Sequence, residues 1–469
     1  MRRLVRLLAV VAALAALLVP AASAADRMWI GFHDDPVFRY GEDRQAEMDL
    51  AARTNNATLL RTLVEWHQIA KTRPANAANP FDPAYNFDDL DELVRNAQAR
   101  DMEVLMAIWG TPEWANGGKK PQYLPRRMSD FQNFARALAS RYSGRTPGLP
   151  FVRFFGIWNE SNLGTFLLPQ FNAKGKIVSP AAYAKLAAAG YAGIKAGSRK
   201  ALVAIGETSS TGRDRKSRGT DAIAPATFMK GIARANKRLR FDAWAQHPYP
   251  LPVNQKPTQK VRYPNVTLTS LPQFEKDLDK AFGRKNIPIW ITEYGNETKP
   301  GEPKGVTERQ QAQYAPQAIA LARKNPRVQM FVWFVFRDSS SSPWQSGLYR
   351  TNGTAKPAQR RFAAAAGGLD AMNGRVLVRS GTRNPALAVH LRSFCANNGI
   401  GTTVGTTVSV ALAGRTLGAT QPAVPLSLDC TISVRAPVTV ARGRTYTVVV
   451  AANTLTGNAA TRTITLVGR

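Results

Sequence analysis

The chain of 469 residues is strongly basic, because 63 Lys and Arg residues face 32 Asp and Glu and give a formal net charge of +31. Its length exceeds one small module and fits a large domain followed by a smaller one. The charge suggests anionic partners, but the chain has no zinc-finger spacing, no basic helix with heptads and no RNA-recognition aromatic motif. We therefore expect no nucleic acid partner. An anionic polymer of the cell envelope, or a compositional bias toward Ala and Arg, explains the charge as well.

The first 24 residues have the pattern of an export signal. Three arginines precede an apolar run, and small residues at 22–24 form a cleavage site. Removing this segment takes away those three arginines and lowers the formal charge to +28. A spanning helix needs about 20 apolar residues, and no later run approaches that length. We expect a protein that is secreted or held in the cell envelope and has no membrane span.

Between residues 28 and 369, short apolar runs that end in polar or aromatic residues alternate with amphipathic helical patterns. The eight runs are 28–34, 58–65, 103–109, 152–158, 202–207, 241–247, 289–293 and 328–334. Such alternation predicts a parallel sheet with crossover helices, and eight units suit a closed barrel better than an open sheet. The glycine-rich phosphate turn of an open sheet is also missing after the first run, which reads GFHDDP. We predict an α/β fold with a (β/α)8 TIM barrel over residues 25–369.

The character of the sequence changes near residue 371. Beyond it there is no Lys, no Glu and a single acidic residue, Asp429, and short Val/Thr-rich alternating runs take over. Their spacing predicts a small all-β sandwich over residues 370–469. The only two cysteines, Cys395 and Cys430, lie in this part, and in an exported chain we expect them to form a disulfide.

In a barrel of this type the active site lies at the carboxyl ends of the strands. The polar and aromatic residues at the ends of the eight runs include Asp34, Arg61, Glu65, Trp109, Asn159, Glu160, Glu207, His247, Tyr249, Glu293 and Trp333. Paired carboxyl groups, donors for ring hydroxyls and flat apolar faces are what a sugar site requires. The four histidines are far apart without ligand spacing, so we expect no metal and no other cofactor.

Two motifs carry a family resemblance. FVRFFGIWNESN places Asn159 and Glu160 directly after the fourth run, and IPIWITEYGNET places Glu293 at the end of the seventh. They resemble the Asn-Glu and Glu hallmarks of glycoside hydrolase clan A, which includes the cellulase-like family 5 and the xylosidase-like family 39. The resemblance covers residues 28–369. It implies a retaining glycosidase with Glu160 as acid/base and Glu293 as nucleophile.

The same resemblance implies substrate-binding roles for further residues. Arg61 is similar to the arginine that supports the nucleophile, and Asn159 to the asparagine that binds the 2-hydroxyl. His247 and Tyr249 resemble a pair whose tyrosine hydrogen-bonds the nucleophile, and Trp333 resembles the platform under the sugar. Trp109 and Asp34 complete the predicted set.

Two departures bear on the family. Ser161 follows Glu160 where many relatives have Pro, and Trp109 ends the third run where family 5 enzymes usually place a His. These differences favour a family-39-like or a divergent family-5-like member.

We therefore expect a secreted, monomeric retaining glycoside hydrolase that cleaves O-glycosidic bonds of a polysaccharide or oligosaccharide, an anionic one included. Two other functions stay open: a catalytically inactive glycan-binding barrel and a basic binder of anionic envelope polymers. Retention of both glutamates, the asparagine and the arginine favours the enzyme. The basic run GRDRKSRG at 212–219 either contacts an anionic substrate or is a solvated loop.

Overall fold

The computed structural model describes residues 28–100, 102–251, 254–366, 375–390, 403–404, 408–412, 415–421, 424–425, 431–453 and 459–469. The expected export signal and the expected disulfide between Cys395 and Cys430 lie outside these residues. None of the helices in the described ranges is long and apolar enough to cross a bilayer.

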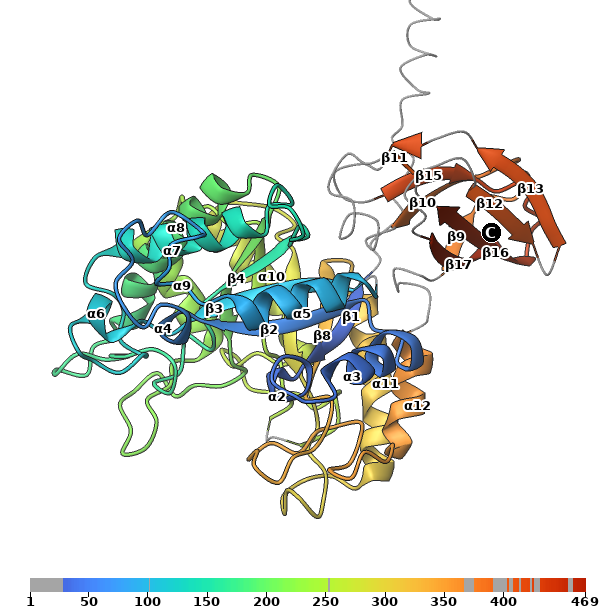
Figure 1. The fold of residues 1–469 in the computed structure, drawn as a ribbon. Coiled ribbons are helices and arrows are strands. Elements are labelled where there is room, and N and C mark those ends of the chain that lie inside the picture. Colours follow the sequence, from blue (N-terminus) through green and yellow to red (C-terminus); the bar gives the residue numbers. More distant parts are fainter. Residues whose placement is uncertain are drawn as a thin grey trace, which may run out of the picture.

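Eight parallel strands form a closed barrel in chain order, and the first strand pairs with the eighth (Figure 1). They are β1 (Trp29–His33), β2 (Leu59–Glu65), β3 (Glu103–Trp109), β4 (Phe154–Ile157), β5 (Leu202–Thr208), β6 (Ala243–Gln246), β7 (Ile289–Tyr294) and β8 (Val328–Phe334). The predicted (β/α)8 fold is confirmed, and each strand falls within or next to a predicted run.

Helices surround the barrel in the order that crossover connections require. They are α2 (Asp35–Phe38), α3 (Arg44–Asp49), α4 (Trp66–Ile69), α5 (Asp88–Gln98), α6 (Glu113–Asn116), α7 (Met128–Arg141), α8 (Ser179–Gly197), α9 (Pro225–Ala235), α10 (Leu271–Phe282), α11 (Glu308–Lys324) and α12 (Pro357–Ala366), with a π-helical turn at Leu50–Thr54 and a 3-10 turn at Leu268–Ser270. Their buried faces pack on the outer side of the strands and form one large apolar core.

A smaller core fills the barrel itself. Side chains such as Leu59, Phe154 and Trp290 meet inside it, away from the helix layer. Because alternate residues of a strand share one face, Arg61 points to the same interior as Leu59 but lies two residues nearer the carboxyl end. The apolar interior thus gives way to a polar layer at the carboxyl ends of the strands.

Helices α7 and α8 are held close by glycines. Gly190, Gly193 and Gly197 lie on one side of α8, and a Cβ atom at Gly193 would overlap with the backbone oxygen of Gln132 on α7. The missing side chains let the two backbones approach each other.

The described residues from 375 onward form β-strands and the turns between them, which agrees with the predicted all-β part. Its strands are β9 (Arg375–Val378), β10 (Ala386–His390), β11 (Thr403–Val404), β12 (Val408–Leu412), β13 (Arg415–Gln421), β14 (Val424–Pro425), β15 (Thr431–Arg435), β16 (Thr445–Asn453) and β17 (Ala459–Gly468). Five of them form a sheet in the order β13-β12-β16-β17-β9, and two further pairs are β10-β15 and β11-β14. Val448 and Ile464, opposite each other on β16 and β17, are buried.

Replacing Gly193 by Ala tests the close approach of α7 and α8. Helix propensity alone would stabilise the protein by about 1 kcal/mol, whereas the overlap with Gln132 should destabilise it by about 1–3 kcal/mol. Urea unfolding gives the sign of the change in the free energy of unfolding. Gly219→Ala is the matched control, because a Cβ there meets nothing within 4 Å. A Gly193→Ala variant that is more stable than the wild type would contradict the packing.

Candidate active site

The polar layer gathers five charged side chains from five strand ends. Arg61 comes from β2, Glu160 follows β4, Glu207 is in β5, His247 follows β6 and Glu293 is in β7. Four of these side chains are buried, and that of Glu160 is partly exposed to solvent. The barrel therefore brings together residues that are up to 232 positions apart in sequence.

Arg61 is the centre of this group. Its Nη1 donates to Oε1 of Glu293 at 2.7 Å, and its Nη2 donates to Oδ1 of Asn159 at 2.8 Å and to Oε2 of Glu207 at 3.1 Å. The guanidinium group is fully buried. A planar donor fork of this kind fixes the directions of its acceptors, so one side chain orients two carboxylates and one amide.

His33 at the end of β1 lies behind Arg61. Nη1 of Arg61 is 2.6 Å from Nδ1 of His33, and Nε2 of His33 is 3.4 Å from Oδ2 of Asp35. Burial and Arg61 lower the pKa of this ring, but Asp35 and Glu293 outweigh them and raise it above its usual value. Because a guanidinium group only donates, Nδ1 must accept, so the geometry fits a neutral ring with its proton on Nε2.

Glu293 is held in its ionised form. Its Oε2 accepts a hydrogen bond from the hydroxyl of Tyr249 at 3.0 Å, in addition to the bond from Arg61. Burial would raise the pKa of Glu293, but His247 and Arg61 lower it well below the usual range. Burial and the Glu293 charge raise the pKa of Tyr249 well above its usual value, so the phenol keeps the proton that it donates.

His247 lies among three carboxyl groups. Its Nδ1 is 3.1 Å from Oε1 of Glu160 and 3.5 Å from Oε2 of Glu293, and its Nε2 is 3.2 Å from Oε2 of Glu207. Burial lowers the pKa of His247, but Glu293, Glu160 and Glu207 together raise it to about 9. The ring is therefore an imidazolium cation at neutral pH.

Glu160 differs from Glu293 in its protonation. Burial raises the pKa of Glu160 and the nearby Glu293 charge adds to this, so that the pKa stays above its usual value despite the opposing effects of His247 and Arg61. One oxygen of Glu160 and one of Glu293 lie within 4.8 Å of each other. The site thus holds an ionised and a more readily protonated carboxyl group side by side.

Glu160, His247 and Glu293 could also offer one ligand atom each to a metal ion. A metal ligand must be a neutral imidazole, however, and the surrounding carboxylates keep His247 protonated at neutral pH. The donor set therefore fits proton transfer better than metal binding.

Glu207 is a third, fully buried carboxylate that the sequence interpretation left without a role. Its Oε2 accepts from Arg61 and from the hydroxyl of Thr292 at 3.0 Å, and it contacts His247. Burial raises the pKa of Glu207, but Arg61 and His247 bring it below the usual value. Its Oε1 lies over Gly156 of β4, where any Cβ atom would overlap with it.

The backbone around the acidic residues has an uncommon conformation. Trp158, Glu160 and Glu207 have positive φ angles of 74°, 36° and 43°. Non-glycine residues seldom adopt such angles, which are enriched at functional sites. The Ser161 hydroxyl donates to the Gly206 oxygen at 2.6 Å and joins the ends of β4 and β5, which gives this departure from the Pro of many relatives a structural role.

Two predicted substrate-binding residues do not point to the acidic pair. Trp333 is fully buried, donates from Nε1 to the Ser346 oxygen at 2.9 Å and packs against Phe362 of α12, so its ring faces the helix layer. A ring in this position cannot stack under a sugar, so the predicted platform at Trp333 is wrong.

Asp34 accepts hydrogen bonds from the backbone nitrogens of Phe336 and Arg337, both at 3.0 Å, and thereby joins the ends of β1 and β8. Burial raises the pKa of Asp34 to about 6.

Trp109 lies at the end of β3 and is half-buried, with its ring edge-on to Trp158 and Phe166. Two aromatic residues that the sequence interpretation missed lie nearer the pair. The centre of the Phe334 ring lies 5.1 Å from that of the His33 ring, and the centre of the Trp344 ring lies 5.2 Å from that of the Tyr249 ring. Both are half-buried, so they replace Trp333 as candidates for a sugar platform.

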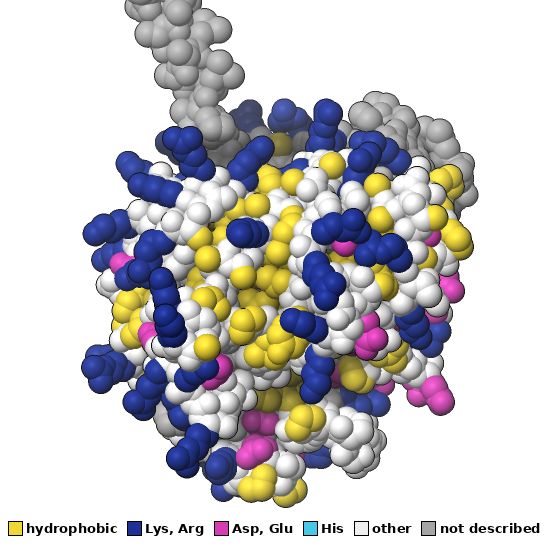
Figure 2. Space-filling model, turned by 90° about the vertical axis from the view of Figure 1, so that its left-hand side faces the viewer, with side chains coloured by type: hydrophobic (Ala, Val, Ile, Leu, Met, Phe, Trp, Pro, Cys, Tyr) yellow, Lys and Arg dark blue, Asp and Glu magenta, His cyan; other side chains and the backbone are white. Residues whose placement is uncertain are grey.

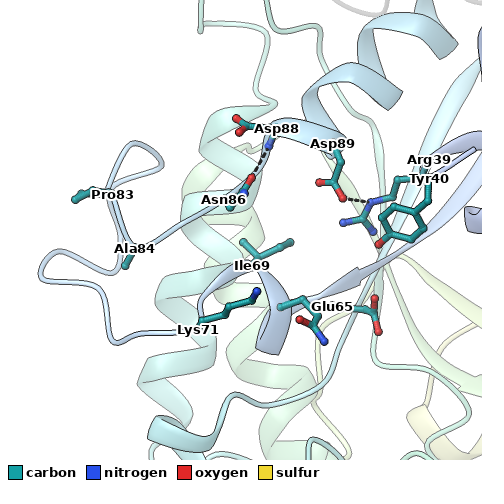
Figure 3. A pocket seen from close by; sticks show the side chains of 11 residues that line it. Arg39, Tyr40, Glu65, Ile69, Lys71, Pro83, Ala84, Asn86, Asp88 and Asp89 are labelled. Carbon is teal, nitrogen blue, oxygen red and sulfur yellow. Dashed lines mark hydrogen bonds and ion pairs between the residues drawn. The ribbon is translucent and has the colours of Figure 1, made fainter. Parts of the chain in front are cut away.

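A cavity of about 560 Å³ opens at the carboxyl end of β2 (Figure 3). Its lining includes Glu65, the half-exposed ring of Tyr40, and Arg39 paired with Asp89 at 2.8 Å. Neither glutamate of the central pair lines this cavity. It adds polar and aromatic groups at the same end of the barrel.

Basic side chains are spread over the face of the molecule in Figure 2, with few acidic ones among them. The run 212–219 lies in the loop between β5 and α9, on the side of the barrel that holds the acidic pair. Its Arg213, Arg215, Lys216 and Arg218 are exposed and form no ion pair within the described ranges. Their contact with an anionic substrate stays a prediction.

Residues 23–338 match the family model described as "Cellulase (glycosyl hydrolase family 5)". The chain belongs to this family. Its fold is similar to that of a family 39 glycoside hydrolase from the gut symbiont Bacteroides cellulosilyticus WH2, with a TM-score of 0.54, 16% identity and coverage of 88% of this chain and 81% of that one. Membership in clan A is thereby confirmed.

Two further structures share the fold. A glucosidase from Croceicoccus marinus has a TM-score of 0.55, 15% identity and coverage of 78% of this chain and 73% of its own. GH5_18 from Streptomyces cattleya in complex with GlcNAc has a TM-score of 0.52, 16% identity and coverage of 80% and 89%. No curated protein sequence matches this chain.

The imidazolium state of His247 can be tested by a histidine NMR titration. We expect His247 to titrate near pH 9, and Glu207→Gln to lower its pKa toward 6.5 because one neighbouring negative charge is lost. Since the folded pKa lies above the unfolded one, the associated stability is complete below about pH 6.5 and is lost as the pH rises through 9.

Thr292→Val is the matched control for this titration. It removes a hydrogen bond to the same Glu207 oxygen but leaves the carboxylate charge. A wild-type His247 that titrates near pH 6.5, or equal shifts in the two variants, would contradict the assignment.

Proposed function

We propose that the protein is a secreted retaining glycoside hydrolase that cleaves O-glycosidic bonds of a polysaccharide or oligosaccharide by double displacement. The observation that carries this proposal is the pair of carboxyl groups with opposite pKa shifts, whose nearest oxygens lie within 4.8 Å. Retaining enzymes need about 5–5.5 Å between these groups, whereas inverting enzymes need about 6.5–9.5 Å to admit a water molecule.

In the first step, an oxygen of Glu293 attacks the anomeric carbon and the bond from this carbon to the leaving oxygen breaks. Glu160 gives its proton to that oxygen. Arg61 and Tyr249 hold Glu293 by one hydrogen bond to each carboxylate oxygen, which fixes its direction of attack. His247 approaches Oε1 of Glu160, so Oε2 is the oxygen left to carry the transferred proton.

In the second step, water attacks the same carbon and the bond to Glu293 breaks. Glu160, now ionised, takes a proton from the water, which restores the starting state. Two inversions at one carbon leave the product with the configuration of the substrate. The His247 cation supports the ionised form of Glu160 in this step by charge attraction at 3.1 Å.

Asn159 is suited to bind the 2-hydroxyl group of the sugar. Arg61 donates to its Oδ1, which turns Nδ2 toward the side where a substrate hydroxyl can accept. Phe334 and Trp344 supply aromatic faces near the same position. The cavity beside Glu65 offers polar groups to sugar units farther along a chain.

The substrate class and location rest on separate arguments. One fold neighbour is a glucosidase and another is a complex with GlcNAc, which supports a pyranoside as the substrate, and we propose that its linkage is β. Secretion rests on the export pattern of residues 1–24, and the positive charge favours a carbohydrate with acidic groups. We propose that the enzyme acts as a monomer.

The two glutamates should respond differently to azide. Glu160→Ala and Glu293→Ala should each lower turnover of an aryl β-glycoside at least about 10³-fold. Azide should rescue Glu160→Ala and give the β-glycosyl azide, because this anion replaces water at the glycosyl-enzyme without needing a base. Product configuration is measured by NMR.

Glu65→Ala is the matched control, since Glu65 also lies at a strand end but contacts neither glutamate. It should leave turnover of the aryl glycoside unchanged. An α-azide from Glu160→Ala, or inverted wild-type products, would show that the roles are misassigned. Full activity in both alanine variants would refute both role assignments, whereas a wild-type protein that binds glycans without hydrolysing them would favour the glycan-binding alternative.

Ending the chain after residue 368 should preserve hydrolysis of small aryl glycosides, because all proposed catalytic residues precede this point. Hydrolysis of insoluble polymers should fall. A truncated chain that fails to fold, measured by circular dichroism across neighbouring end points, would show that the C-terminal strands complete the core of the barrel.

A further inference from the structure

A second pocket lies at the opposite end of the barrel from the acidic pair. It has a volume of about 360 Å³ and is lined by Tyr191, Lys237, Arg238, Leu239, Arg240, Phe241, Phe282 and Arg284. Arg240 and Phe241 immediately precede β6, and Arg284 precedes β7, whereas the proposed catalytic residues lie at the carboxyl ends of the strands. The length of the strands therefore separates the two sites.

The positive charges of this pocket have no acidic partners. Lys237, Arg238, Arg240 and Arg284 form no ion pair within the described ranges. The neighbouring acids are already paired, Asp242 with Lys195 at 2.8 Å and Asp279 with Arg327 at 2.7 Å. Other arginines of the barrel, such as Arg141, do have close carboxylate partners.

Two of the guanidinium groups are held in place by aromatic rings. The Arg284 guanidinium lies 4.5 Å from the centre of the Phe241 ring, and its Nη1 donates to the Phe241 oxygen at 2.9 Å. The Arg240 guanidinium lies 5.3 Å from the centre of the Tyr191 ring. Such stacking limits the freedom of the side chains and leaves N–H groups to bind an anion.

The composition of the pocket points to anionic groups on a soluble polymer, and carboxylates are the choice that rests on the proposed function. Phe241 and Phe282 are buried, so the pocket presents no apolar side chains that would enter a lipid bilayer. Tyr191 is half-buried and covered by Arg240, so it offers no open ring on which nucleic acid bases stack. A guanidinium fork matches a carboxylate in a bidentate arrangement.

We propose that this pocket is a non-catalytic binding site for an acidic polysaccharide whose carboxylates bind Arg240, Arg284 and the lysine and arginine beside them. It holds the polymer at the end of the barrel away from the catalytic pair. The choice of a polysaccharide rests on the proposed function, whereas the anion site itself does not.

Affinity for polygalacturonate tests the proposal. The full chain is used with Glu293→Ala, so that no cleavage interferes, and binding is measured by biolayer interferometry at two salt concentrations. The triple variant Lys237→Gln/Arg238→Gln/Arg240→Gln should weaken binding about tenfold or more, as expected for the loss of charge-assisted hydrogen bonds. Fully methyl-esterified polygalacturonate should bind neither form.

The matched control is Arg309→Gln/Lys324→Gln/Arg360→Gln, which removes the same charge from exposed positions on α11 and α12. This control should change affinity by less than about threefold if binding is local rather than a property of the total charge. Equal weakening by the two triple variants, or no weakening by either, overturns the proposal. So does a pocket variant that loses affinity for duplex DNA or for phosphatidylserine vesicles but not for polygalacturonate.

A second pair of variants tests the aromatic support. Tyr191→Phe keeps the ring under Arg240 and should bind as the parent does, whereas Tyr191→Leu removes it and should weaken binding. Equal affinities for these two variants contradict the role of the ring. With Glu293 intact, the pocket variants should hydrolyse a neutral aryl glycoside at the parental rate, so failure of this site and failure of the proposed catalysis are distinguishable.

Discussion

The buried guanidinium group of Arg61 is the interaction on which the site depends. A charge removed from water is tolerated only when opposite charges and hydrogen bonds replace the water, and removing one partner leaves the others uncompensated. For Arg61 these partners are Glu293, Glu207 and Asn159, each from a different strand end. The site therefore forms only when β2, β4, β5 and β7 are in register, because the hydrogen bonds that satisfy Arg61 join the ends of these strands.

The number of charges in this cluster explains why Glu160 and Glu293 differ in their protonation. Three carboxyl groups, Glu160, Glu207 and Glu293, face two cations, Arg61 and His247. Two of the carboxylates can be balanced, and the third is the one that retains a proton most readily. Glu160 has no bond to Arg61 and is the most exposed of the three, so the proton belongs there, where an incoming molecule can reach it.

Much of this arrangement could be predicted from the sequence, because alternation and strand order are local properties. The eight runs gave the strands, and two motifs gave Glu160 and Glu293. The motif indicates Trp333 by its residue type, but the register of β8 does not: Met330 and Val332 face the barrel interior, so the same period of two places Phe334 on that face. Trp344 lies in a loop without any period, and the role of Glu207 depends on partners more than 30 residues away. A sequence pattern could therefore predict neither the position of Trp344 nor the role of Glu207.

The contact between Gly156 and Glu207 makes a residue without a side chain part of the charge balance of the site. No side chain fits at position 156 while the Glu207 carboxylate occupies its place. An alanine there would displace this carboxylate, and His247 would then lose one of its three acidic neighbours. The absence of a single methyl group on β4 thus helps to keep a cation between the glutamates at neutral pH.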